Sequence, residues 1–117
     1  MHVLLLLVMS SFVFYNSVSG QDLGDGVVRK ILAHDEKLMM VEVSFDAGAV
    51  GALHNHEHEQ VCYVLEGLFE FTIGDETRLV GKGDSLHFSS MVMHGTRCLE
   101  AGRLLDVFTP CRMDFLS

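Results

Sequence analysis

From Val27 onward the chain alternates short apolar stretches with tight polar turns and shows no helical periodicity of useful length. Phe69, Phe71 and Ile73 alternate with polar residues, which is typical of a strand that is buried on one face. The predicted strands cover residues 27–33, 38–45, 60–66, 69–73, 77–80, 85–88, 96–99 and 104–108. Many short strands separated by closely spaced turn signals predict an all-β sandwich or barrel.

Length and charge limit the classes of protein that this chain can belong to. Its 117 residues are enough for one domain with a real hydrophobic core. Sixteen acidic against eight basic residues exclude a nucleic-acid partner and give no basic patch for anionic membranes. Cys62, Cys98 and Cys111 are far apart and form no Cys-x-x-Cys motif, so we expect small apolar core residues rather than a disulfide scaffold or zinc ribbon.

The first twenty residues differ from the rest because they contain no Asp, Glu, Lys or Arg. Apolar runs at 3–9 and 12–15 precede the small residues 18–20, which suit signal-peptidase cleavage before Gln21. These apolar runs are too short, and the serines between them interrupt them too much, for a membrane-spanning helix. We therefore expect residues 1–20 to be an export signal for the periplasm or exterior, and residues 21–117 to form the domain. A basic n-region, which export signals normally have, is missing. The alternative is therefore a cytoplasmic protein in which residues 1–20 either pack on the domain as a strand or are non-native sequence translated from an upstream start codon.

Histidines indicate a candidate metal site. His54 and His56 are two residues apart, so on an extended strand both side chains leave the same face. With Gln60 and His94 they offer three imidazoles and an amide oxygen, a plausible ligand set for a divalent metal. A His-x-His pair alone is weak evidence, and Gln60 could instead be an ordinary polar residue at the start of a strand. His58 could add a ligand, but its acidic neighbours favour a solvated turn.

Glycine spacing strengthens the metal interpretation. Five residues separate Gly48 from His54, six separate Gln60 from Gly67, and a Gly83-Asp84 turn opens the segment that ends at His94. This pattern resembles the two motifs of the cupin family, which implies a small jelly-roll barrel with a metal bound in its mouth. The chain departs from that pattern in having Gln60 where most cupins have Glu, and in lacking the prolines common in the second motif.

Three segments make the resemblance more specific: 54–60, 63–67 and 105–116. Over about residues 22–116 the chain is similar to the KdgF-type cupins of pectin degradation, which act as uronate linearases. The resemblance implies metal-dependent opening of 4,5-unsaturated monouronates into linear keto sugars, with Ni, Zn, Mn or Fe as the single metal ion. It implies His54, His56, Gln60 and His94 as metal ligands, and it places Asp106, Phe108 and Arg112 around a small anionic sugar. Cupins of this size also commonly form dimers, for which the apolar stretch 38–41 is a candidate interface.

The chemistry of these residues is consistent with that substrate class. Four neutral ligands leave the charge of a divalent ion uncompensated, so the site would attract an anion. Arg112 carries a planar fork suited to a carboxylate, although an exposed position beyond Pro110 is the alternative. Asp106 and Phe108 share a strand face, which would place an acid–base group beside an apolar platform. Alternatively, Asp106 caps a turn or pairs with a surface base.

Two functions of other classes remain open at this stage. A metal-dependent cupin dioxygenase could use the same neutral histidine set, and it would be recognised by its metal and its need for dioxygen. A non-catalytic sugar-binding cupin would bind uronates without changing the rate at which their rings open.

Overall fold

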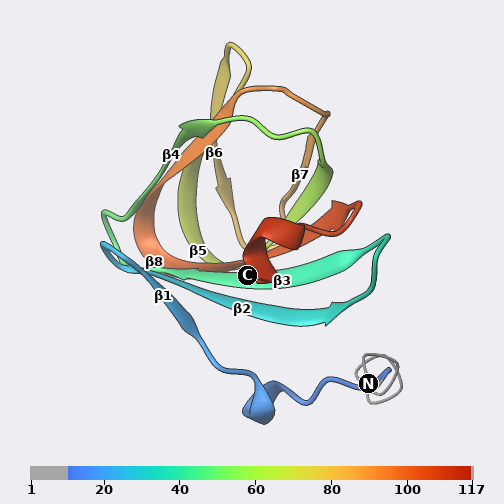
Figure 1. Ribbon diagram of the computed structural model, residues 1–117. Helices are drawn as coiled ribbons and strands as arrows, with labels where there is room; N and C mark the ends of the chain where they lie inside the picture. The colour runs from blue at the N-terminus through green and yellow to red at the C-terminus, as the bar shows by residue number, and fades with distance from the viewer. Residues whose placement is uncertain (1–10, 117) are drawn as a thin grey trace.

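The computed structural model describes residues 11–116, and the strands within them form a single sheet that curls back on itself (Figure 1). The strands are β1 (Gln21–Gly24), β2 (Val27–His34), β3 (Met39–Phe45), β4 (Val50–His54), β5 (Glu59–Ile73), β6 (Glu76–Gly81), β7 (Ser85–Phe88) and β8 (His94–Thr109). Two short 3-10 turns, η1 (Tyr15–Ser17) and η2 (Met113–Leu116), lie near the two ends of this range. The predicted all-β architecture is therefore confirmed.

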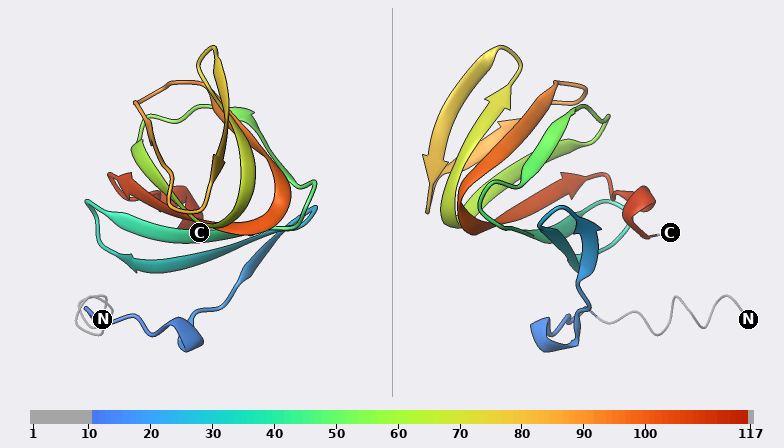
Figure 2. Two further views of the ribbon diagram at one scale, coloured as in Figure 1. Left: turned by 180° about the vertical axis from the view of Figure 1, so that it is seen from behind. Right: turned by 90° about the vertical axis from the view of Figure 1, so that its left-hand side faces the viewer.

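Two long strands, β5 and β8, organise the sheet. Hydrogen-bonded neighbours follow the order β1-β2-β3-β8-β5-β6, while β4 pairs with β8 and β7 pairs with β5. The first part of β5 pairs with β7 and the last part with β6, whereas β8 pairs first with β4 and then with β3. Each long strand thus bends from one side of the curled sheet to the other, as Figure 2 shows. Their antiparallel pairing brings the start of β5 beside the end of β8.

The bend falls at two glycines that touch each other. Gly67 has φ of +93°, and a Cβ atom there would lie 2.6 Å from the Cα of Gly102. A Cβ on Gly102 would in turn collide with the backbone oxygen of Glu66. The register between β5 and β8 shifts in the same region, as expected for a bulged and bent strand. The sequence predicted that strands end on either side of this region, but the chain remains paired there. The predicted strands 60–66 and 69–73 are therefore parts of one strand, β5, and 96–99 and 104–108 are parts of one strand, β8.

Burial along the strands follows the predicted alternation. Phe69 and Phe71 are buried and Ile73 packs partly buried against the same core cluster. A second cluster contains Met39, Val41, Phe108 and Cys111. The three cysteines are buried and free, as predicted.

Strands β1 and β4 were not predicted. Both are short, contain glycine, and leave most of their side chains exposed, so they carry no alternating apolar pattern. Burial also limits the candidate dimer interface, because Met39 and Val41 lie in the core and only Leu38 and Met40 of that stretch are exposed.

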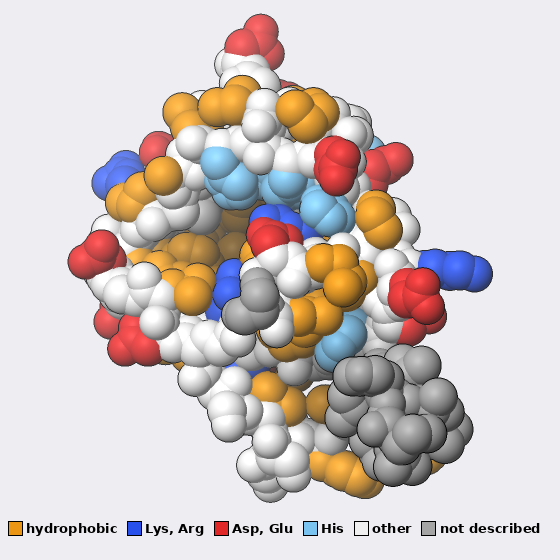
Figure 3. Space-filling view, in the orientation of Figure 1, with side chains coloured by type: hydrophobic (Ala, Val, Ile, Leu, Met, Phe, Trp, Pro, Cys, Tyr) orange, Lys and Arg blue, Asp and Glu red, His pale blue; other side chains and the backbone are white. Residues whose placement is uncertain are grey.

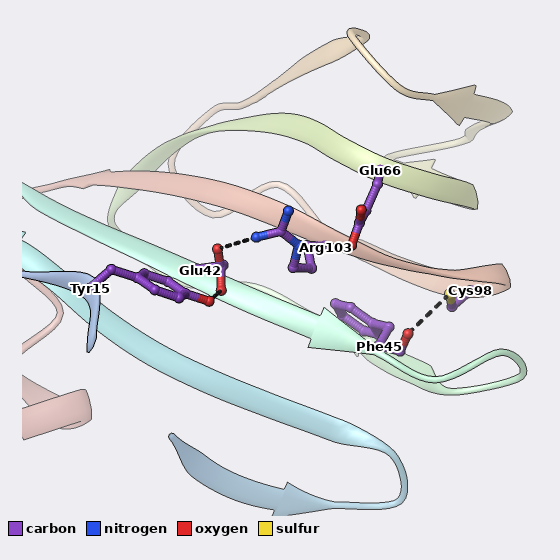
Figure 4. A network of polar contacts seen from close by, with 6 residues as sticks. All are labelled: Tyr15, Glu42, Phe45, Glu66, Cys98 and Arg103. Atoms are coloured by element: carbon purple, nitrogen blue, oxygen red, sulfur yellow. Dashed lines mark hydrogen bonds and ion pairs between the residues drawn. The ribbon is translucent and has the colours of Figure 1, made fainter. Parts of the chain in front are cut away.

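A polar network joins the N-terminal segment to the sheet (Figure 4). Tyr15 donates from Oη to Oε1 of the buried Glu42 at 2.7 Å, and Arg103 donates from Nη1 to Oε2 of the same carboxylate at 2.9 Å. Arg103 also donates from Nε to Glu66 at 2.8 Å. The second half of the expected export signal therefore contacts the domain, and residues 1–10 lie outside the described range. Within the described residues, no helix has the length and apolar character needed to cross a membrane.

Candidate metal centre and substrate pocket

Three of the four predicted metal ligands form a cluster. His54 ends β4 and lies directly opposite His94, the first residue of β8, while His56 follows in the turn before β5. One potential ligand nitrogen from each of the three lies within 4.8 Å of the others. The ring centroids of His54 and His94 are 4.5 Å apart, and those of His56 and His94 are 5.0 Å apart. Strand pairing thus brings together histidines that are forty residues apart in the sequence.

The backbone sets the orientation of each imidazole. Nδ1 of His54, His56 and His94 lies 2.8, 2.8 and 3.1 Å from the backbone oxygen of Ala52, His58 and Val92, respectively. A carbonyl oxygen only accepts, so in the neutral form of each ring Nδ1 carries the hydrogen and Nε2 the lone pair. Such outer hydrogen bonds fix the tautomer of metal-binding histidines in proteins.

Gln60 connects this cluster to Asp106. Its Nε2 donates to Asp106 Oδ1 at 2.9 Å, which fixes the amide so that Oε1 faces His56 Nε2 at 3.0 Å. Since Nδ1 of a neutral His56 already donates to a carbonyl, two lone pairs oppose each other across that 3.0 Å. A cation bound between them would relieve this opposition, so the donor set fits a divalent metal.

Burial keeps the imidazoles in the form that a metal requires. It lowers the pKa of His94 to about 4, and it lowers the pKa of His56 as well. Both rings are therefore neutral near pH 7, and neutral imidazole is the ligand form. The ring of His58 is not part of this cluster; its backbone oxygen accepts from His56, while its own Nδ1 is buried without a hydrogen-bond partner.

Asp106 is a buried carboxyl beside the histidine cluster. Burial raises its pKa to about 6, against the opposing effect of hydrogen bonds from Cys62 and Gln60 and of the charge on Arg112. Cys62 lies directly opposite Asp106 in the pairing of β5 with β8, and burial raises the pKa of its thiol. A carboxyl with a pKa of about 6 can both accept and donate a proton near neutral pH. The turn-cap and surface-pair alternatives for Asp106 do not fit this buried position.

A cavity of about 390 Å³ opens beside these groups. In Figure 3, histidine side chains gather at the rim of a hollow with an apolar floor. Six of the predicted site residues line the cavity: His54, Gln60, His94, Asp106, Phe108 and Arg112. His56 joins the histidine cluster without lining the cavity. Two further lining residues, Arg29 and Phe115, were not predicted from the sequence.

Arg112 is held at the cavity by one carboxylate and two aromatic rings. Its side chain is only 12% exposed, which excludes the exposed alternative. Nε and Nη2 donate to the two carboxylate oxygens of Asp114 at 3.1 and 2.9 Å. The guanidinium carbon lies 5.1 Å from the ring centroid of Phe108 and 4.2 Å from that of Phe115. One edge of the predicted carboxylate fork is therefore already paired within the protein.

Comparison with known proteins places this site in a family. The cupin domain family matches residues 41–108. Pectin degradation protein KdgF of Dickeya dadantii (strain 3937) is 45% identical over 98 residues, which cover 82% of this chain and 89% of that protein. The solved structure of KdgF from Halomonas sp. superimposes with a TM-score of 0.87 at 40% identity, covering 92% of this chain and 99% of that one. An RmlC-like cupin from Shewanella frigidimarina NCIMB 400 gives a TM-score of 0.89 at 37% identity, covering 92% and 96%.

The curled antiparallel sheet, the histidine cluster and the family match define the class: this chain belongs to the cupin family. Within that family it is similar to KdgF proteins in both sequence and structure. The resemblance predicted from the sequence is therefore confirmed.

Proposed function

We propose that this protein is a metal-dependent cupin that opens 4,5-unsaturated monouronates, released during pectin or alginate breakdown, into linear keto sugars. The observation that carries the proposal is the buried Asp106, which lines the cavity and bonds to Gln60 beside the histidine cluster. Similarity to the pectin degradation protein KdgF supports a role in uronate metabolism.

The ligands in this proposal are His54, His56, His94 and the amide oxygen of Gln60. A bound divalent ion would supply a Lewis acid whose charge these neutral ligands leave uncompensated, and it would favour an anionic sugar. Asp106 is not itself a ligand in this proposal. Its hydrogen bond to Gln60 keeps the amide oxygen turned toward His56.

The reaction requires proton transfer at two positions of the sugar. The hydroxyl proton on C1 must leave as the bond between C1 and the ring oxygen breaks, which gives an aldehyde at C1 and an enolate whose oxygen is on C5. That proton must then reach C4, so that the enolate becomes a ketone at C5. In this proposal Asp106 accepts the proton as a carboxylate and returns the same proton to C4. Positioned proton transfer is typically worth roughly 10²- to 10⁴-fold in rate.

Phe108 and Arg112 position the ring in this mechanism. Phe108 offers an apolar face on the same side of β8 as Asp106, and Arg112 places positive charge at the cavity. The cavity of about 390 Å³ is of the size that takes a small ligand.

The test follows the ultraviolet absorbance of the conjugated alkene in a freshly prepared unsaturated monouronate. We expect metal-loaded protein to speed its decay, without dioxygen, and expect Asp106→Asn to remove most of that acceleration. Asp75→Asn, in the exposed turn between β5 and β6, is the matched control and should behave as wild type. Decay at the buffer rate would contradict an enzymatic role and leave a sugar-binding cupin, whereas a strict need for dioxygen would indicate a dioxygenase.

A further inference from the structure

A second arginine faces the same cavity as Arg112. Arg29 lies on β2, far from the metal motif in sequence, and its side chain lines the pocket. Its guanidinium carbon is 3.8 Å from the ring centroid of Phe115, and that of Arg112 is 4.2 Å from the same centroid. The aromatic ring of η2 therefore holds two positive groups beside one cavity.

These two arginines differ in the hydrogen-bond partners that their guanidinium groups already have within the protein. Arg112 uses the N–H of Nε and one N–H of Nη2 for Asp114, so both N–H groups of Nη1 and the second of Nη2 remain. Arg29 uses Nε for the neutral side-chain oxygen of Gln21 at 2.8 Å, and among the described residues no carboxylate forms an ion pair with it. Both terminal nitrogens of Arg29 therefore remain available to a ligand in the cavity.

Charge in the cavity wall points to the same ligand. Arg112 forms an ion pair with Asp114, whereas the partner of Arg29, Gln21, is neutral and does not offset its positive charge. Burial and the neighbouring Arg112 lower the pKa of Arg29, an effect that Asp114 opposes. An anion placed between the two guanidiniums would relieve their repulsion. Asp25 and Asp106 also line the cavity, so the charge of Arg29 offsets negative charge in the same wall.

We propose that Arg29 is a specificity-determining residue that binds the carboxylate of an acidic sugar through its two terminal nitrogens, with Nη1 of Arg112 as a second donor. The assignment of the ligand as a uronate rests on the proposed function. In this arrangement Arg29 selects uronic acids over the corresponding neutral sugars, and Asp106 retains its role at the reacting atoms.

The test measures binding rather than turnover. Saturated galacturonate and neutral galactose are titrated calorimetrically into metal-loaded wild type, Arg29→Gln, Arg29→Lys and the control Arg78→Gln. Arg78 is exposed on β6 and pairs with Glu76, so it offers a loss of the same charge away from the cavity. A melting curve for each variant confirms that it is folded.

We expect wild type and Arg78→Gln to prefer galacturonate. Arg29→Gln should bind galacturonate about 10- to 100-fold more weakly, the usual worth of a hydrogen bond to a charged group, with galactose binding unchanged. Arg29→Lys keeps the charge but not the planar fork, so its affinity for galacturonate should lie between those of wild type and Arg29→Gln. If Arg29→Gln does not fold, wild-type affinity of Arg29→Lys for galacturonate would contradict binding by the fork.

Binding of galacturonate by Arg29→Gln within about twofold of wild type would overturn the proposal, because a charge-assisted bond is worth more. Equal affinity of wild type for the two sugars would overturn it as well. Failure of the enzymatic proposal is a separate result. If wild type does not speed ring opening, but its preference for galacturonate is absent from the Arg29→Gln variant, Arg29 still has its role in binding.

Discussion

Replacing Gln60 by Glu tests why this cupin carries an amide at that position. The Nε2 of Gln60 lies 2.9 Å from Asp106 Oδ1 and donates to it. In the Glu variant an oxygen takes the place of that nitrogen, so two carboxyl groups face each other in a buried site. In metal-free protein they cannot both be ionised at low cost, and one must retain a proton.

The size of this effect follows from that 2.9 Å separation. Two full charges there would repel by about 6 kcal/mol at an effective dielectric constant of 20. Keeping one proton avoids this, at a cost of about 1.4 kcal/mol for each pH unit above the normal Glu pKa of about 4.3. We therefore expect the metal-free Gln60→Glu variant to be less stable than wild type by about 3–4 kcal/mol at pH 7 and by about 1 kcal/mol at pH 5. Because the pKa of the carboxyl that keeps its proton is raised in the folded variant, stability falls as the pH rises above the pKa of that group in the unfolded chain.

The assay is urea denaturation of chelator-treated protein at pH 5 and pH 7 for wild type, Gln60→Glu, Asp106→Asn and the double variant. In the Asp106→Asn background the penalty of Gln60→Glu should be mostly lost, because only one carboxyl remains. Equal penalties at both pH values, or in both backgrounds, would refute the coupling between Gln60 and Asp106.

Four further predictions concern other parts of the molecule. In metal-free protein, Asp106→Asn should gain stability relative to wild type as pH rises from 4 to 7, by up to about 3 kcal/mol in urea titrations, because burial raises the pKa of Asp106 from 3.8 to about 6; a gain independent of pH would contradict that shift. Gly67→Ala should cost at least about 3 kcal/mol in the same titrations, since it meets both a positive φ and the backbone of Gly102, and a loss below about 1 kcal/mol would show that the bend can relax. Phe108→Leu should weaken galacturonate binding by calorimetry severalfold through loss of the aromatic face, and unchanged affinity would remove Phe108 from the sugar site. If residues 1–20 are an export signal, mass spectrometry of protein purified from its own cells should give a mature chain starting at Gln21; a chain that retains those residues would contradict export by cleavage there.

The fold class was predictable because two local signals agree. Period-two alternation around Phe69 marks strands buried on one face, and glycine spacing around His54 and His56 marks the motif. Continuity of β5 and β8 was not predictable, because a glycine in a sequence is a turn signal whether the chain reverses there or only bends. The contact of Gly67 with Gly102 decides between the two, and it depends on residues distant in sequence.

The site was predictable only where its residues lie in recognisable segments. Those around His54 and Asp106 belong to motifs, and the structure brings them together. Arg29 carries no local signal, and its contact with Phe115 arises because β2 and η2 meet at the cavity only after the sheet has curled. Cys62 was interpreted as an apolar core residue, and its position directly opposite Asp106 becomes visible only once the strand register is known.

Metal stoichiometry tests the account most directly, because the cluster of imidazoles and the Gln60 amide is the centre of the proposed site. Calorimetric titration of metal-free protein with Zn²⁺, Mn²⁺ or Ni²⁺ should give one bound ion per chain for at least one of these metals. His94→Ala should weaken that binding by more than the roughly 10- to 100-fold that loss of an outer hydrogen-bond partner costs. His87→Ala, an exposed histidine paired with Glu59, should bind as wild type does. Absence of binding by wild type, or unchanged affinity in His94→Ala, would contradict the metal centre and the mechanism built on it.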